Sequence, residues 1–495
     1  MSPAPTSLAA LARVVPGASI VGDPATTVTG LYQDSRKLTA GAAFAVRRGA
    51  TSDARAFLPA ALARGARAII TDTRWDDPPV PALVVPDVQA AIGPLARAVY
   101  GDPFRELVVV GVTGTNGKTT TVHLLRQLLD ALGHRAASLG TLGVKLGEHE
   151  EAGAHTTPEA DDLARAALGL VARGATHLAM EVSSHALALS RVAGVPFRVA
   201  CFTNLTHDHL DFHGSLAAYG EAKARLFVDP APGASVIHVG DAFGRGLASR
   251  AGGEVLTVAA TADPGAGLDA PSVESDLGGT RAVVRRGARS AELGSPLIGR
   301  HNLENVMVAL GAALALGAPL DDAARALGRA TAAPGRLEQV STADDDVLVL
   351  VDYAHTPDAL TRALTTLRHV ATRRVWCVFG CGGDRDREKR PRMGAAAAAL
   401  ADELVVTDDN PRGEPPEEIT GAVMVGVRGA GRAAVVIHDR RDAIAHAVGR
   451  AAPGDVVLVA GKGHEPYQET AGERRAFDDR AEARAALVAR REARR

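Results

Sequence analysis

The chain has 495 residues, which at about 150 residues per domain predicts roughly three domains. Its 55 Lys and Arg residues nearly balance its 57 Asp and Glu residues, so no overall field would draw it to nucleic acid or to an anionic membrane, and neither is expected as a partner. Its three cysteines have no paired spacing, which argues against a disulfide scaffold or a zinc site and favours a cytoplasmic setting. Because no export signal and no run of about 18 apolar residues is present, we expect neither secretion nor a membrane span.

The first 105 residues are predicted to form a small mixed α/β domain. Short apolar runs, such as AFAV (43–46) and ARAIITD (66–72), alternate there with Gly and Pro. The segment GDPFREL (101–107) is the expected end of this domain.

A second domain is predicted over 106–333. It begins with an apolar strand, a glycine loop and leucines at helical spacing. The strand-like runs THLAMEV (176–182), VACFTNL (199–205) and SVIHVG (235–240) then alternate with helical stretches, which indicates a parallel sheet. From 259 to 299 the shorter alternation predicts antiparallel strands or loops attached to that sheet.

A third domain, Rossmann-like, is predicted over 334–495, after the break at AAPGR (332–336). Four of its predicted strands end in polar loops. Since ligands of open α/β sheets bind at the carboxyl ends of the strands, these four loops are expected to lie along one crevice. The fold class is therefore α/β, with a phosphate-loop sheet in the middle domain.

The glycine loop GVTGTNGKTT (111–120) has the chemistry of a phosphate cradle. Glycines let backbone N–H groups close on an anion, Lys118 adds a point charge and Thr119 offers a hydroxyl to magnesium. The spacing departs from the strict G-x-x-x-x-G-K pattern, because Val112 stands where that pattern has glycine. The position between a strand and an amphipathic helix still predicts nucleotide binding. A guanine-reading N-K-x-D motif is absent, which favours ATP.

Acidic and histidine residues follow the loop. Glu181 ends an apolar strand of the same domain, where a magnesium ligand is its natural use. The run NLTHDHLDFHG (204–214) is close to the H-x-H-x-D-H metal pattern of some hydrolases, but Phe212 interrupts it, so a metallohydrolase is the remote alternative. Spacing alone indicates that Lys223 is a solvated charge on a helix.

The order of these motifs resembles the Mur ligases, ATP-dependent amide-forming enzymes of peptidoglycan precursor synthesis. The resemblance runs from Asp34 to Gln468. Single motifs are shared across the family and with folylpolyglutamate synthases, whereas DDNPR together with GKGHE is typical of the member that adds the third residue of the peptide. The matching motifs are GTNGKTT, HTTPE, EVSSHAL, NLTHDHLDFHG, AKARLF, GRHNLEN, PGR, DYAHTPDAL, FGCGGDRD, DDNPR and GKGHEPYQ.

The resemblance implies the three-domain Mur ligase architecture and a reaction through an acyl phosphate. ATP would phosphorylate a D-glutamyl carboxylate, and the incoming amine would then displace phosphate. Mg²⁺ would be held by Thr119, Glu181, His209 and a CO2-derived carbamate on Lys223, a modification that replaces the solvated-lysine interpretation. The ATP-binding residues that the resemblance implies are Gly114, Thr115, Asn116, Gly117, Lys118, Thr119, Thr120, His301, Asn302, Asn305, Arg336 and Asp352, with His355 nearby. His301 and Asn302 could equally form a helix N-cap.

The resemblance also implies a site for the UDP-muramoyl dipeptide. Its contacts would be Ser35, Ala50, Thr51, Ser52, Thr156, Thr157, Ser183 and Arg191. Leu189 stands where several relatives have glutamine, so one polar contact to this substrate is expected to be absent or replaced.

The loop around DNPR combines both charge signs, and the acceptor meso-diaminopimelate would explain this. Its far end carries a carboxylate, which suits a guanidinium fork, and an ammonium group, which suits acidic side chains. Arg412 and Arg385 are expected to bind the carboxylate, and Pro411 to stiffen the loop. The residues expected at the ammonium end and backbone are Asp409, Asn410, Gly461 and Glu465.

Three further alternatives stay open at this point. A lysine-adding ligase of the same fold would be expected to lack the DNPR arginine. A dinucleotide-binding dehydrogenase is suggested by FGCGGD (379–384), although Arg385 occupies the place of the third glycine. The third is a non-catalytic nucleotide switch. We expect a monomer whose domains close on each other, with hinges near 101–107 and 332–336.

Overall fold

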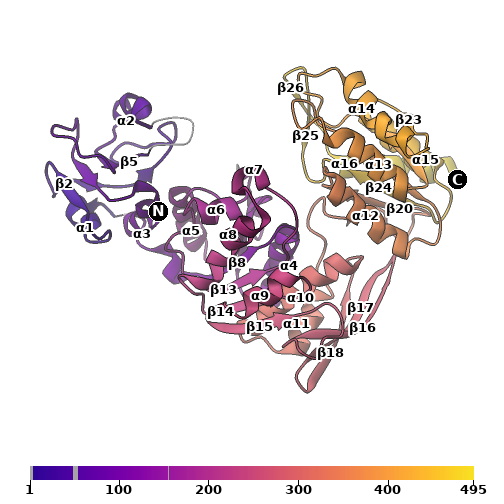
Figure 1. Cartoon of the computed structure of the whole chain (residues 1–495), viewed down its shortest axis with the longest axis horizontal. Coiled ribbons are helices and arrows are strands. Elements are labelled where there is room, and N and C mark those ends of the chain that lie inside the picture. Colours follow the sequence, from indigo (N-terminus) through magenta and orange to yellow (C-terminus); the bar gives the residue numbers. More distant parts are fainter. Residues whose placement is uncertain (1–3, 48–53, 154, 495) are drawn as a thin grey trace. The chain divides into compact units, whose positions relative to one another are not determined.

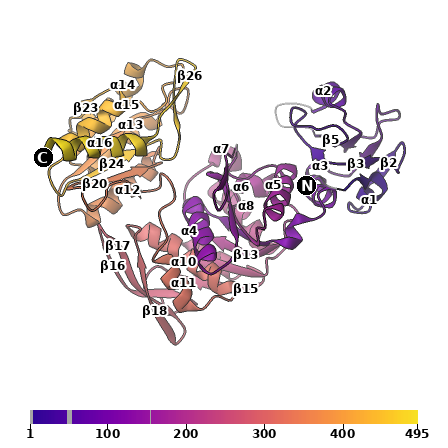
Figure 2. The ribbon, with the colours of Figure 1, turned by 180° about the vertical axis from the view of Figure 1, so that it is seen from behind.

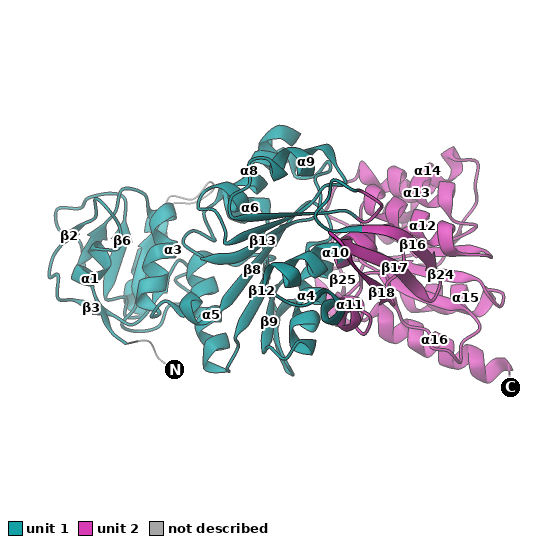
Figure 3. Cartoon of the chain, turned by 90° about the horizontal axis from the view of Figure 1, so that it is seen from below, with its two compact units in different colours: residues 1–259, 264–269, 307–323 teal, residues 260–263, 270–306, 324–495 magenta. Residues whose placement is uncertain are grey.

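The computed structural model describes residues 4–47, 54–153 and 155–494, and its contacts divide the chain into two compact units (Figures 1 to 3). The first unit comprises residues 1–259, 264–269 and 307–323, and the second comprises residues 260–263, 270–306 and 324–495. The division at residues 105 and 333 into three domains stays a prediction. In the described part of the chain, no helix combines the length and the apolar character needed to cross a bilayer.

The first hundred residues form a five-stranded mixed sheet in the order β2-β7-β6-β5-β4. Its neighbours pair in parallel except β2 with β7, so the predicted mixed α/β character is confirmed. Two further strands of the same segment, β1 and β3, form a separate two-stranded sheet. The elements are β1 (Thr6–Ser7), α1 (Leu8–Ala12), β2 (Ser19–Val21), β3 (Thr27–Val28), β4 (Leu31–Tyr32), β5 (Ala43–Val46), η1 (Ala54–Phe57), α2 (Leu58–Ala63), β6 (Ala68–Thr71), β7 (Ala82–Val84), α3 (Val88–Val99) and η2 (Pro103–Glu106).

An eight-stranded sheet in the order β11-β10-β9-β12-β8-β13-β14-β15 forms the rest of the first unit. Strands from β9 to β15 pair in parallel, as predicted, and β10 and β11 add an antiparallel edge. The strands are β8 (Val108–Thr113), β9 (Ala136–Gly140), β10 (Gly143–Leu146), β11 (His149–Glu151), β12 (His177–Glu181), β13 (Phe197–Phe202), β14 (Ala234–His238) and β15 (Glu254–Val258). The helices between them are α4 (Lys118–Ala131), α5 (Ala160–Ala172), α6 (Ser184–Ala188), α7 (Leu210–His213), α8 (Leu216–Val228) and α9 (Ala242–Ala248).

The order of this sheet positions the nucleotide chemistry. β8 lies between β12 and β13, and all three run in the same direction. The loops that follow them therefore meet at one edge of the sheet. These loops carry the glycine cradle, Glu181 and the histidine-rich run.

The antiparallel strands predicted between 259 and 299 are present as a sheet of their own, β16-β17-β18. They comprise β16 (Asp269–Asp276), β17 (Gly279–Arg286) and β18 (Arg289–Ser295). Two helices follow, α10 (Arg300–Ala315) and α11 (Leu320–Leu327). The division between the units falls within α10.

The second unit contains a six-stranded sheet in the order β19-β20-β24-β21-β22-β23, parallel except for β19. The strands are β19 (Glu338–Gln339), β20 (Leu348–Asp352), β21 (Val375–Phe379), β22 (Glu403–Val406), β23 (Val435–Val436) and β24 (Val456–Ala460), and β25 (Tyr467–Thr470) and β26 (Glu473–Ala476) form a hairpin. The helices are α12 (Pro357–Val370), α13 (Lys389–Leu400), α14 (Pro416–Gly429), α15 (Arg440–Arg450) and α16 (Asp479–Arg494).

Alternate residues of these strands pack on opposite faces. Leu458 and the residues that face the same side in the neighbouring strands pack with α12, α13 and α14. Val457 and Val459, which face the other side, pack with α15 and α16. Burial on both faces explains why the strands are continuous apolar runs. The four strands that end in polar loops, β20, β24, β21 and β22, are neighbours that run in parallel, so their loops follow at the same edge of the sheet. That these loops line one crevice stays a prediction.

Candidate active site

The glycine cradle joins β8 to α4. Gly114 (φ 153°) and Gly117 (φ 84°) have backbone conformations that favour glycine. A Cβ on Gly114 would lie 1.9 Å from the Thr203 hydroxyl, so no side chain fits there. The loop therefore packs against the end of β13, with the positive end of α4 beside it.

Lys118 folds back onto this loop. Its Nζ donates to the carbonyl oxygens of Gly114 and Thr115, each at 2.8 Å. In this position the ammonium group is held at the cradle by two neutral acceptors. A phosphate oxygen would be a stronger acceptor for the same group.

Lys223 is buried rather than solvated. Only 1% of it is exposed, and its Nζ donates to the carbonyl oxygen of Gly114 at 2.8 Å. The ring of Tyr219 lies 4.3 Å from Nζ. Burial, together with the charge of Lys118, holds the pKa of Lys223 well below its ordinary value. The interpretation from spacing alone was wrong, because α8 turns this face toward the cradle.

Glu181, at the end of β12, is 1% exposed and accepts hydrogen bonds on both oxygens. The Thr119 hydroxyl donates to Oε2 at 3.0 Å, and the Thr141 backbone N–H donates to Oε1 at 2.8 Å. A Cβ on Gly140 would lie 2.2 Å from Oε1, so this glycine makes room for the carboxylate. A buried carboxylate beside a hydroxyl is a donor set that suits Mg²⁺.

His209 lies apart from this pair in the contacts it makes. It has a left-handed backbone (φ 50°) before α7, and 47% of its side chain is exposed. Its ring is 4.9 Å from that of His185, and its Nε2 is 3.5 Å from Asp208. Among the residues that the structure describes, no group of three or more His, Cys, Asp or Glu side chains is arranged to hold a metal.

The predicted dipeptide-side residues Thr157, Ser183 and Arg191 are gathered in the first unit. The Thr157 hydroxyl donates to the Glu181 carbonyl oxygen at 2.9 Å and accepts the Ser183 N–H at 3.0 Å. Arg191 donates to the Thr157 carbonyl oxygen and pairs with Glu159 at 2.8 Å.

Other residues predicted for this substrate are more scattered. The Thr156 and Thr141 hydroxyls lie 3.1 Å apart. Ser35 is buried in the first hundred residues, and Ala50, Thr51 and Ser52 lie outside the described residues. The carbonyl oxygen of Leu189 accepts a hydrogen bond from Gln89, which gives that position a structural role through its backbone.

The residues predicted for the adenine and ribose side lie in the second unit. His301 is half-buried, with its Nδ1 3.1 Å from the Thr366 hydroxyl, and loss of solvent around its ring lowers its pKa to about 4. Asn302 donates to the carbonyl oxygen of Ile298 at 3.0 Å, and Asn305 is buried on the same helix.

Arg336 and Asp352 lie near Tyr353, which the sequence analysis did not single out. The Arg336 guanidinium is 4.8 Å from the centre of the Tyr353 ring, and its buried Nε has no hydrogen-bond partner among the described residues. Asp352 accepts the Leu337 N–H at 2.7 Å, and burial raises its pKa. The DYAH motif would have indicated Tyr353 as an aromatic surface for a flat base.

The predicted acceptor arginines both contact backbone of the loop after β21. Arg412 has a left-handed backbone (φ 53°), and its Nη1 donates to the carbonyl oxygen of Gly383 at 2.8 Å. Its own N–H donates to the Glu469 carbonyl oxygen on the hairpin at 2.9 Å. Arg385 is exposed and contacts the Asp384 carbonyl oxygen.

Asn410 and Glu465 are held together by a lysine that the sequence analysis missed. Lys462 is fully buried, and its Nζ donates to Asn410 Oδ1 at 2.9 Å and lies 3.5 Å from Glu465 Oε2. Asn410 Nδ2 donates to the same Glu465 oxygen at 3.0 Å. A lysine two residues after the buried strand β24 was the available signal.

Glycine is required where these acidic residues approach the sheet. Gly461 has φ 122°, and a Cβ there would lie 2.5 Å from Asp409 Oδ2. Arg440, fully buried and paired with Asp479 at 2.7 Å, donates to the Ala460 carbonyl oxygen next to it. Asp409 therefore faces a tightly packed backbone.

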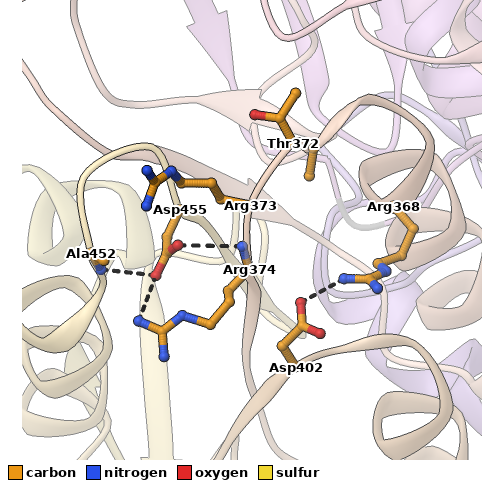
Figure 4. Close-up of a pocket in the computed structure, with 8 residues that line it drawn as sticks. Arg368, Thr372, Arg373, Arg374, Asp402, Ala452 and Asp455 are labelled. Carbon is orange, nitrogen blue, oxygen red and sulfur yellow. Dashed lines mark hydrogen bonds and ion pairs between the residues drawn. The ribbon is translucent and has the colours of Figure 1, made fainter.

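A cavity of about 440 Å³ in the second unit is separate from these loops (Figure 4). Arg368, Arg374, Asp402 and Asp455 line it, at the amino ends of the strands. Asp455 accepts hydrogen bonds from Ala452 N–H and Trp376 Nε1, and Arg368 pairs with Asp402. These ion pairs secure strand ends, and none of the predicted site residues is among them.

Two family models match this chain. The profile of the Mur ligase middle domain matches residues 112–313, and that of the Mur ligase glutamate ligase domain matches residues 335–463. The chain belongs to the Mur ligase family. The resemblance seen in the sequence and the α/β class are thereby confirmed, and the metallohydrolase and dehydrogenase alternatives lose their support. Mur ligases use ATP as a cosubstrate, and this chain is accordingly an ATP-dependent ligase of peptidoglycan precursor synthesis.

Individual relatives extend over nearly the whole Mur ligase chain. A protein of Xanthomonas campestris pv. campestris named UDP-N-acetylmuramoyl-L-alanyl-D-glutamate--2,6-diaminopimelate ligase is 44% identical over 488 residues, 97% of this chain and 98% of the relative. A Pseudomonas aeruginosa protein of the same name is 43% identical and covers 93% of this chain and 95% of the relative.

Solved structures show the same fold. A structure of a ligase with that name has a TM-score of 0.74 at 36% identity and covers 98% of this chain and 99% of its own. The MurF ligase from Thermotoga maritima in complex with ADP has a TM-score of 0.62 at 19% identity, covering 94% and 98%, and shows the fold alone.

Proposed function

We propose that this Mur ligase joins meso-2,6-diaminopimelate to UDP-N-acetylmuramoyl-L-alanyl-D-glutamate while converting ATP to ADP and phosphate. The observation that carries the proposal is Arg412, held by its backbone and side chain at the edge of the sheet that also presents Asp409 and Asn410. The names of the relatives, which include this acceptor, support it. The lysine-adding reaction is the competing possibility.

The reaction proceeds in two displacements. A D-glutamyl carboxylate oxygen attacks the γ-phosphorus of ATP, the bond to ADP breaks, and an acyl phosphate forms. The acceptor amine nitrogen then attacks the acyl carbon, the C–N bond forms, phosphate leaves with the bonding electron pair, and the amine loses a proton. Negative charge accumulates where carboxylate and phosphate meet, so fixed positive groups provide most of the stabilisation.

The cradle supplies those groups. The backbone N–H groups at the start of α4 and the helix dipole favour the phosphates. Lys118 exchanges the carbonyl oxygens of Gly114 and Thr115 for phosphate oxygens. The residues from Gly114 to Thr120 therefore bind and orient the nucleotide, and Arg336 and Tyr353 offer a flat cationic and aromatic surface for its base.

Thr119 and Glu181 fit a magnesium ion, which when bound would neutralise charge on the phosphates. Lys223 is proposed as the carbamate: a buried amine with a lowered pKa has the neutral form that CO2 requires. The carbamate would turn a cation into an oxygen donor near the cradle. His209 is proposed as a further ligand, through an imidazole that is half exposed.

Acceptor choice would depend on Arg412. L-Lysine lacks the distal carboxylate, so its binding would leave a desolvated guanidinium without an anion, at a cost of about 3–5 kcal/mol. Asn410 and Glu465, with Asp409 and Gly461, are proposed to take the ammonium end.

The deciding assay measures ADP release from ATP with the UDP-muramoyl dipeptide and either meso-diaminopimelate or L-lysine. Release that requires meso-diaminopimelate supports the proposal. Release with L-lysine assigns the competing reaction, and release with neither removes both. We further propose a cytoplasmic monomer whose domains close on the substrates, which small-angle scattering with and without ligands would test.

A further inference from the structure

A single arginine in the middle of α5 contacts two parts of the first unit that are far apart in the sequence. Arg165 Nη1 donates to the Leu31 carbonyl oxygen at 2.7 Å and to the Tyr100 hydroxyl at 3.0 Å. Its Nη2 donates to Asp161 at 3.1 Å and also to Asp162. The guanidinium lies 4.2 Å from the centre of the Tyr32 ring. Arg165 thus uses both terminal nitrogens of its guanidinium, with an aromatic ring beside it.

The two aspartates next to Arg165 continue the contact. Asp161, 2% exposed, accepts the side-chain amide of Gln33 at 2.7 Å and its backbone N–H at 3.3 Å. Asp162 pairs with Lys37 at 2.9 Å. The segment 31–37 is therefore attached to α5 at three successive points. We call these side chains, Arg165, Asp161 and Asp162, the α5 clamp.

Leu31, which Arg165 contacts, is also held by Tyr100. The Tyr100 hydroxyl accepts the Leu31 N–H at 3.1 Å and donates to its carbonyl oxygen at 3.0 Å. Tyr100 follows α3 directly, and α3 packs beside α5 (Figure 3). Arg165 thus completes a buried network that closes around one residue of segment 31–37.

The position of α5 gives the clamp a functional consequence. Segment 31–37 carries Ser35, and the residues just before α5 are Thr156 and Thr157. The family resemblance implies that both groups contact the same sugar-nucleotide substrate. Glu159, the residue before the helix, pairs with Arg191 of that group. One helix therefore connects two loops that would bind the same ligand.

We propose that Arg165 is a positioning residue. It holds the Ser35 loop and the Thr156–Thr157 loop at the separation that binding of the UDP-muramoyl dipeptide requires. A ligand that spans two loops binds best when their separation is already set. The clamp also opposes movement at the predicted hinge near 101–107, so closure would depend on the hinge near 332–336. This inference rests on the proposed function.

The test compares Arg165→Met with Arg173→Met, an exposed arginine at the end of the same helix whose guanidinium donates a hydrogen bond to the carbonyl oxygen of Gly169. Arg165→Met is expected to raise KM for the UDP-muramoyl dipeptide about tenfold or more, while kcat and the KM for ATP stay within about twofold. Arg165→Lys, which keeps the charge but loses the fork, is expected to lie between wild type and Arg165→Met.

Calorimetric binding adds a readout that misfolding would not produce. Affinity for UDP alone, which reaches one loop, is expected to fall less than affinity for the whole UDP-muramoyl dipeptide. Equal losses for both ligands, parallel changes in the KM for ATP, or values equal to those of Arg173→Met would overturn the inference. If Arg165→Met does not fold, Asp161→Asn and Arg165→Lys carry the same comparison. A wild-type protein that does not use this dipeptide would instead overturn the proposed function.

Discussion

Lys118 and Lys223 donate to the same atom, the carbonyl oxygen of Gly114, each at 2.8 Å. Burial, and after it the charge of Lys118, holds the pKa of Lys223 well below its ordinary value. This geometry supports the proposal that Lys118 binds the phosphates and that Lys223 is the amine that CO2 modifies.

Replacing Lys223 by Met should abolish most ligase activity without destabilising the fold, because an apolar side chain of similar length takes the place of a buried amine. The comparison is Lys145→Met, an exposed lysine in the same unit. We expect kcat to fall by roughly 100-fold or more for Lys223→Met alone, with an unchanged or higher melting temperature. With ¹³C-labelled bicarbonate, a carbamate resonance should appear in wild type and be missing in Lys223→Met. Full activity of this variant would contradict the carbamate proposal.

Glu181→Gln keeps the size of the side chain and removes the charge that Mg²⁺ requires. The amide oxygen can still accept from the Thr141 N–H, and the amide NH2 group can donate to the Thr119 hydroxyl oxygen in place of the bond it accepts now, so the fold should persist. The magnesium concentration for half-maximal ADP release is expected to rise about tenfold or more, with a lower kcat. Glu150→Gln, at an exposed position, serves as the control. An unaltered magnesium dependence would assign Glu181 a purely structural role.

Arg412→Lys tests acceptor recognition. An ammonium group cannot reproduce the guanidinium fork, so KM for meso-diaminopimelate should rise roughly 100-fold while KM for ATP changes less than about twofold. Arg475→Lys, a largely exposed arginine on β26, is the matched control. Equal losses for both substrates would mean that Arg412 serves only to build the loop.

Lys462→Met removes the buried ammonium group that orients Asn410. In this variant Asn410 Oδ1 would still accept a hydrogen bond from the Glu469 N–H, whereas Glu465 would lose a nearby positive charge. We expect KM for meso-diaminopimelate to rise about tenfold, with the KM for ATP unchanged. Steady-state kinetics with each substrate varied in turn provides the measurement. A variant with wild-type kinetics would show that Asn410 keeps its orientation without the lysine.

Glu414 gives a prediction about pH. Arg390 and the Asp384 N–H hold the pKa of Glu414 at about 2, below its ordinary value of 4.5. Because the folded pKa is the lower one, its contribution to stability is complete above pH 4.5 and is lost as pH falls toward 2. The urea midpoints of wild type and Glu414→Gln should therefore differ most near neutral pH and converge below pH 4.5. Glu473→Gln, at an exposed site, should show no such convergence. A constant difference across this range would disprove the assignment.

The sequence alone was sufficient for features that depend on neighbours in the chain. The glycine cradle, the parallel strands and the alignment of the polar loops after β20, β21, β22 and β24 follow from periodicity and glycine placement. These features can be predicted because each depends on residues that are close together in the sequence.

Features that depend on distant partners could not be predicted in the same way. Lys462 pairs with Asn410 across 52 positions, and Arg165 contacts Leu31 across 134. The burial of Lys223 likewise arises because α8 faces the cradle, which its helical spacing does not reveal. Each of these long polar side chains has the local pattern of a surface charge, and only the fold shows which group it meets.

The backbone of Arg412 pairs with Thr470 as a short parallel bridge, so the hairpin β25–β26 restrains the backbone of this residue. The main chain at this position is fixed independently of the side chain that it presents. If Arg412 selects the acceptor as proposed, a substitution at this position would change the acceptor that the enzyme uses while the backbone around it stays in place.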